Sequence, residues 1–197
     1  MASRVSKRPA STPASPRSRP LGALTESALR AELDRALAAA DGGAGAHAIH
    51  ELWMRGEMGI LVERELAALW KRAADSVPDW LPMRFVDRLA EVYEITARFA
   101  GAGRGRYNIY LVLLDYADSR PEPHGLYVGM SHYAPAERFD QHKAGIRAAG
   151  SVLHRGLEVL TGPTLHLQGL KRGAAARIEA GLAEALTAAG FFVQGGR

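Results

Sequence analysis

The chain has 197 residues, of which 47% are hydrophobic, and a formal net charge of +4 at pH 7. It contains no cysteine, which excludes disulfides and thiolate metal sites and is compatible with a reducing, cytoplasmic location. No apolar run approaches the roughly 18 residues that span a bilayer, so we expect no membrane partner.

Charge is distributed unevenly along the chain. Residues 1–20 carry five Arg or Lys and no acid, residues 21–100 carry nine basic and thirteen acidic side chains, and residues 101–197 carry eleven basic and eight acidic ones. Basic segments at the two ends suit contact with phosphates, although an ordinary solvated surface explains the same charges.

Residues 1–20 consist largely of Ser, Pro, Ala and Arg and offer almost nothing to bury. We predict a disordered basic tail, because such a segment cannot offset the entropy of ordering. It has no apolar core of about 7–15 residues, so it does not read as a secretory signal. The tail either touches nucleic acid non-specifically or has no role.

Residues 21–100 have the pattern of a helical domain whose role the sequence does not name. Thr25 is the expected N-cap of a first helix, and leucines recur at four-residue spacing at Leu29, Leu33 and Leu37 until Asp41, Gly42 and Gly43 end it. A second helical region starts near Ala46, and a last helix runs roughly from Arg84 to Phe99. A protein partner or self-association through residues 21–100 is the expected use of this region.

His47, His50 and Glu51 lie close together in the second helical region and raise the question of a metal site. No third ligand follows at a recognisable spacing, and the i,i+4 pair His47 and Glu51 is common on solvated helix faces. We therefore prefer the surface interpretation.

The pattern changes after a glycine-rich linker at residues 101–106. Residues 107–114 form a continuous apolar run typical of a strand buried on both faces. A second strand, antiparallel to the first, is expected at 125–129, a helix from Pro135 to about Ala144, a half-exposed third strand at 164–168, and a helix at 174–189. The predicted fold class is α+β: a small three-stranded antiparallel sheet flanked by helices, in the order β-β-α-β-α, preceded by an all-helical region.

Four motifs fall on these elements in a particular order. Asn108, Ile109 and Tyr110 open the first strand; Tyr127, Val128 and Gly129 close the second; Arg138, His142 and Lys143 follow on one helix; and Glu179 lies on the last helix. In this order they resemble the signatures of the GIY-YIG nuclease superfamily. The resemblance covers about residues 107–195, so that 107–197 is expected to be a nuclease domain, and it includes none of the first hundred residues.

The resemblance implies a metal-dependent endonuclease that hydrolyses phosphodiester bonds in DNA with one divalent cation, Mg²⁺ or alternatively Mn²⁺. It implies Glu179 as the metal ligand, which suits Mg²⁺ as a hard oxygen donor. Arg138 is expected to act in catalysis and to bind phosphate through its planar fork. Tyr110 is expected to be the base and Tyr127 to position water or phosphate.

His142 and Lys143 are the remaining candidates, for proton transfer and for phosphate binding. Asn108 stands where the family has Gly; if that backbone position needs a positive φ, Asn is the least costly substitute. Gln194 is a loose match to a polar residue after the glutamate helix. The alternatives are a non-catalytic nucleic-acid-binding module with a nuclease-like fold, or a partner-binding protein that acts through the helical domain.

Overall fold

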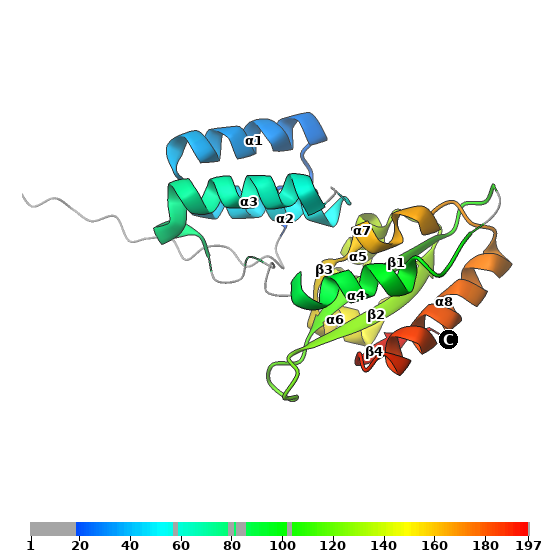
Figure 1. The fold of residues 1–197 in the computed structure, drawn as a ribbon. Helices are drawn as coiled ribbons and strands as arrows, with labels where there is room; N and C mark the ends of the chain where they lie inside the picture. Colours follow the sequence, from blue (N-terminus) through cyan, green and yellow to red (C-terminus); the bar gives the residue numbers. More distant parts are fainter. Residues whose placement is uncertain (1–18, 57–58, 79–80, 82–85, 102–103, 197) are drawn as a thin grey trace, which may run out of the picture.

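The computed structural model describes residues 19–56, 59–78, 81, 86–101 and 104–196 (Figure 1). It is an α+β structure, which confirms the predicted fold class at that level. Most of the tail predicted to be disordered, residues 1–18, lies outside the described residues. Within the described ranges, no helix is both long and apolar enough to cross a membrane.

Three helices follow one another in the N-terminal part: α1 (Glu26–Ala39), α2 (Gly42–Met54) and α3 (Gly59–Ala73), the last continued by a 3-10 turn at Ala74–Ser76. The predicted cap of α1 is confirmed, because the Thr25 hydroxyl accepts the Ala28 N–H at 3.3 Å. The prediction that α2 starts near Ala46 is wrong. Asp41 does not only follow α1; its carboxylate accepts the Ala44 N–H at 3.0 Å and so caps α2 at Gly42.

Helix α4 (Val86–Thr96) contacts α8 (Arg172–Ala188) and α7 (Thr161–Thr164). In the view of Figure 1, α4 is drawn in front of the sheet. The Arg88 guanidinium donates to the Ala189 carbonyl at 3.2 Å and lies 3.7 Å from the centre of the Phe191 ring. The last helix of the 21–100 region therefore packs on the C-terminal part of the chain, and a domain boundary at 101–106 stays a prediction.

The sheet has four strands in the order β3-β1-β2-β4. They are β1 (Asn108–Asp115), β2 (His124–Ser131), β3 (Gly156–Val159) and β4 (Val193–Gly195). Strand β1 pairs antiparallel with β2 and β3, as predicted for the first two strands, whereas β2 pairs parallel with β4. The predicted three-stranded antiparallel sheet is therefore wrong in its strand number and in the direction of its edge strand.

The third strand was predicted in the wrong segment. Residues 164–168 form the end of α7 (Thr161–Thr164) and a 3-10 turn at Leu165–Leu167. The Gln168 amide donates to the carbonyls of Ile109 at 2.8 Å and Thr164 at 2.7 Å, so this segment joins β1 through a side chain and not through a strand ladder. The third strand of the structure contains Glu158, which is buried. A charged residue at a buried position breaks the apolar pattern from which a strand is predicted.

Strand β1 is buried on both faces, as its sequence predicts. Ile109, Leu111 and Leu113 belong to the larger core, which α8 shares. The alternate residues, Tyr110, Val112 and Leu114, belong to a smaller core under α5 (Pro135–Lys143) and α6 (Gly150–Arg155). Of the functional candidates, Tyr110 belongs to this smaller core and Tyr127 packs against it.

A buried ionic network joins α2 to α5. Glu51 on α2 is 1% exposed and accepts Arg19 at 2.7 and 3.0 Å and Arg55 at 2.7 Å. Arg19 also pairs with Asp140 on α5. Burial would raise the pKa of Glu51, but the hydrogen bonds and charges of Arg19, followed by those of Arg55, outweigh burial and bring the pKa below its ordinary value.

The Glu51 network predicts a pH-dependent stability. A carboxyl whose pKa is lowered by folding stabilises the protein above its unfolded value of about 4.3, and the stabilisation is lost as pH falls through the lower folded value. Glu51→Gln should therefore destabilise the protein by about 3 kcal/mol at neutral pH, with a smaller difference in acid. Urea unfolding at a series of pH values measures both quantities.

Glu26→Gln is the matched control, because Glu26 forms an exposed i,i+4 pair with Arg30 and exposed pairs contribute little. It should change stability by less than about 0.5 kcal/mol. A Glu51→Gln protein as stable as the wild type at neutral pH would contradict the proposed weight of the network.

Candidate functional site

Tyr110 on β1 and Tyr127 on β2 lie over the same glycine. Strand pairing places Tyr110 opposite Gly129, and the two phenol rings are 6.0 Å apart between centroids. A Cβ at Gly129 would lie 2.6 Å from the Tyr110 hydroxyl oxygen and 2.7 Å from a ring carbon of Tyr127. Glycine is required at this position because the rings occupy the space of any side chain.

His142 on α5 completes this aromatic group. Its Nε2 lies 2.9 Å from the Tyr110 hydroxyl oxygen, and its Nδ1 accepts the Ala149 backbone N–H at 2.9 Å. A backbone N–H can only donate, so Nδ1 carries a lone pair and the neutral ring has its proton on Nε2. His142 therefore donates to Tyr110, which leaves the Tyr110 hydroxyl proton free to be donated elsewhere.

The environment keeps the His142 ring uncharged. Burial first, and the charge of Arg138 second, lower the pKa of His142 from 6.5 to about 4. The ring is 1% exposed. At neutral pH His142 is thus a neutral hydrogen-bond donor that fixes Tyr110, and it does not provide positive charge for a phosphate.

The two phenols differ in their access to solvent. Tyr110 is 1% exposed, whereas Tyr127 is only partly buried. Burial and the neighbouring Tyr127 raise the pKa of Tyr110 well above its ordinary value, against the effect of Arg138. Burial also raises the pKa of Tyr127; the hydrogen bond with Tyr110 opposes the rise and the charge of Glu179 adds to it.

Arg138 lies within electrostatic reach of both tyrosines and of His142. Its guanidinium donates to Gln141 at 2.9 Å and to the carbonyls of Ile146 at 3.2 Å and Arg147 at 2.7 Å. These contacts fix the plane of the guanidinium against the loop after α5. A guanidinium has five N–H groups, and the three contacts leave others for a ligand.

The hydrogen bonds of Lys143 go to α6 and β3 and not to the tyrosines or His142. Its ammonium donates to the carbonyls of Leu153 at 3.0 Å and Gly156 at 3.3 Å, at the junction of α6 and β3. This is the contact expected of a cation at a helix C-terminus. The structure thus gives Lys143 a position that stabilises α6, and phosphate binding by this residue stays a prediction.

Glu179 approaches the cluster from α8. Its Oε1 accepts the Met130 N–H at 3.1 Å, and Met130 directly follows the second motif on β2. Burial raises the pKa of Glu179, and the Met130 hydrogen bond offsets only part of that rise. A carboxylate whose charge is not compensated by its surroundings is one that a bound cation would stabilise.

The donor set at Glu179 fits a metal that keeps most of its water. In the part of the chain that the structure describes, no three His, Asp or Glu side chains gather as a metal site. A single carboxylate suits Mg²⁺ rather than Zn²⁺, which takes three or four protein ligands. The surface interpretation of the second-region candidates is wrong for His50 and Glu51, which are buried. Two arginines bind Glu51, and His50 lies 3.4 Å from Glu158.

Asn108 has a role that the sequence did not reveal. It lies in the extended strand β1 and is not a positive-φ residue, so the backbone argument for Asn does not apply. Its side-chain amide instead donates to the Tyr133 carbonyl at 2.9 Å and accepts the Gly169 N–H at 3.0 Å. Asn108 thereby fixes the loop after β2 to the segment before α8.

Sequence reasoning also missed the residues that position the candidates. Gln141, which holds Arg138, could have been found from its i,i+3 spacing on the same helix. The Ala149 N–H, which sets the proton position of His142, leaves no signal because any residue could supply it. Gln194, the loose match, pairs with Tyr127 across the β2–β4 ladder.

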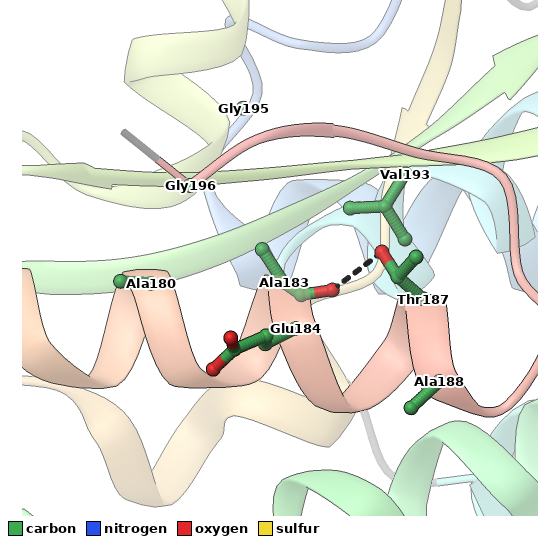
Figure 2. Close-up of a pocket in the computed structure, with 8 residues that line it drawn as sticks. All are labelled: Ala180, Ala183, Glu184, Thr187, Ala188, Val193, Gly195 and Gly196. Carbon is green, nitrogen blue, oxygen red and sulfur yellow. Dashed lines mark hydrogen bonds between the residues drawn. The ribbon is translucent and has the colours of Figure 1, made fainter.

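A hollow between α8 and β4 lies apart from these residues (Figure 2). It is lined by small side chains and Glu184 of α8, and by Val193, Gly195 and Gly196. The Thr187 hydroxyl at its wall donates to the Ala183 carbonyl at 2.8 Å within the helix. This hollow contains none of the predicted site residues, and we place the candidate site at the tyrosines.

Comparison of the chain with protein-family models, with curated proteins and with solved structures finds no match. The function proposed below therefore depends on the geometry of the cluster and on the motif resemblance.

The state of His142 is open to direct measurement. Its Cε1–H resonance should titrate with a midpoint of about 4 in the folded protein. In urea the His142 resonance should titrate at about 6.5. Because the unfolded state binds the proton more tightly, stability should fall by about 3 kcal/mol as pH falls between these values. A folded-state midpoint near the unfolded one would contradict the neutral-donor assignment.

Proposed function

We propose that this chain is a metal-dependent endonuclease that hydrolyses phosphodiester bonds in DNA. The observation that carries the proposal is the convergence of Tyr110, Tyr127, Arg138 and His142 from two strands and a helix, with Glu179 reaching the same end of the sheet. These residues come from distant parts of the sequence and match the four motifs of the GIY-YIG resemblance in order.

Arg138 is the group proposed to bind the scissile phosphate. A phosphodiester in its transition state spreads negative charge over its oxygens, and preorganised donors stabilise that charge. The guanidinium is already oriented by Gln141 and by the two loop carbonyls. Little reorganisation is then needed when the phosphate arrives.

The geometry favours Tyr127 over Tyr110 as the base, which reverses the roles expected from the resemblance. The Tyr110 oxygen is buried and accepts from His142, so it is suited to orient its neighbour. Tyr127 is more accessible and lies near Glu179. In the proposed step Tyr127 first loses its phenol proton to solvent. The phenolate then takes the proton of the attacking water as a P–O bond forms and the opposite P–O bond breaks, and solvent protonates the leaving oxygen.

Glu179 is the residue proposed to hold a divalent cation, Mg²⁺ or Mn²⁺. When bound, such a cation supplies positive charge that neutralises phosphate oxygens and lowers the pKa of water and nearby hydroxyls. The part played by the protein is to hold the carboxylate in place through the Met130 N–H.

Cleavage of a panel of single-stranded, branched and duplex DNA and of RNA, with Mg²⁺ or Mn²⁺ added, tests the proposal. The full-length protein should cut at least one DNA substrate, and chelation should stop cutting. Tyr127→Phe, Arg138→Ala and Glu179→Gln should each reduce the rate by about 10²-fold or more.

Glu184→Gln is the matched control for Glu179→Gln, because Glu184 is an exposed carboxylate on the same helix. It should cut at the wild-type rate, and circular dichroism should show that all variants are folded. Undiminished cutting by Glu179→Gln would overturn the single-metal assignment.

A non-catalytic nucleic-acid-binding module is the second candidate. It is favoured by one observation: burial raises the pKa of both phenols, so that neither is ionised at neutral pH in the free protein. This function predicts binding that Mg²⁺ does not convert into cleavage of any substrate in the panel.

A further inference from the structure

The end of the sheet beside Glu179 carries an aromatic loop that the proposed chemistry does not use. His132 and Tyr133 directly follow β2, three residues or fewer after the Met130 N–H that Glu179 binds. Both are exposed, and Tyr133 is 37% exposed. Their ring centroids are 4.1 Å apart, and the ring of Tyr107 lies 6.4 Å from that of His132.

The backbone of Tyr133 is held on both sides. Its N–H donates to the Ser131 hydroxyl at 3.1 Å, and its carbonyl accepts the Asn108 amide at 2.9 Å. Asn108 is itself held by the Gly169 N–H at 3.0 Å. Two hydrogen bonds thus fix the main chain that carries this exposed ring.

Basic side chains lie on the two segments to which Asn108 joins this loop. The Gly105 N–H donates to Gly169 at 2.8 Å, and Tyr107 and Leu170 exchange backbone hydrogen bonds at 2.7 and 3.0 Å. This short pairing brings two exposed arginines and the two exposed cations that open α8 to one edge of the sheet: Arg104, Arg106, Lys171 and Arg172. Within the described ranges none of the four forms an ion pair with a carboxylate.

We propose that His132 and Tyr133 form a stacking platform for an unpaired nucleobase of single-stranded DNA, with the four cations binding the flanking phosphates. Aromatic rings bind bases of any sequence through their π-faces, and nearby cations follow the strand. A paired base in a duplex is already stacked and does not offer its face to a protein ring. The platform deepens the proposed function, since it names the substrate as DNA unpaired beside the cut bond.

Asn108 is the positioning residue of this platform. Glycine, which the GIY-YIG signature has at this place, has no side chain to reach the Tyr133 carbonyl. The departure from the signature is then explained by a binding role for the loop that Asn108 holds.

Binding without metal tests the platform separately from catalysis. Fluorescence anisotropy of a labelled oligothymidylate with the full-length protein in EDTA should give tighter binding than a duplex or an abasic strand of equal length. Tyr133→Ala should weaken oligothymidylate binding by roughly 5- to 100-fold, and Tyr133→Trp should restore it. Asn108→Ala should weaken it less than Tyr133→Ala does.

Trp70→Ala is the matched control, because Trp70 is an aromatic residue on α3 that is 49% exposed and lies outside the platform. It should bind as the wild type does. Salt titration separates the two kinds of contact: Tyr133→Ala should leave the slope of log K against log salt unchanged, and each phosphate-binding cation replaced by Ala should reduce it by about 0.7.

Equal binding of the abasic strand and of oligothymidylate would overturn the platform, as would equal competition by polyglutamate. Unchanged binding of oligothymidylate by Tyr133→Ala would also overturn the platform. Selective binding of unpaired strands with no cleavage would support the platform and contradict the endonuclease. Cleavage with no preference for unpaired bases would support the endonuclease and contradict the platform.

Discussion

The hydrogen bond between Tyr110 and His142 joins β1, an inner strand of the sheet, to the helix that carries Arg138. Both polar groups are buried, and leaving either unpaired would cost about 1–3 kcal/mol. Helix α5 therefore cannot slide along β1 without losing this contact. The position of Arg138 relative to the two tyrosines, and the glycine that makes room for their rings, depend on that fixed docking.

The sequence predicted the elements that repeat an apolar pattern. Strand β1 and helices α5 and α8 lie where periodicity and the Pro135 signal placed them, because their buried residues recur at the spacing of one element. Strand β3 was missed for the opposite reason. It is four residues long, and its Glu158 is buried against His50, a partner about a hundred residues away that no local pattern reveals.

The same distinction holds for the candidate site. The residue types and order of the motifs indicated which side chains meet, and Tyr110, Tyr127, Arg138 and His142 do meet. Their protonation and hydrogen bonding could not be predicted from the sequence, because both depend on contacts that form only on folding. The proton position in His142 is set by the Ala149 main chain, and the role of Asn108 by a loop and a turn that follow it by 25 and 61 residues.

The parallel pairing of β4 with β2 has a consequence during protein synthesis. Strand β2 is complete at Ser131, but its outer edge stays uncovered until residues 193–195 have left the ribosome. An open strand edge is a template for pairing with other chains. While the next roughly sixty residues are synthesised, the edge of β2 can therefore pair with a neighbouring chain. The pairing of β4 with β2 then covers that edge.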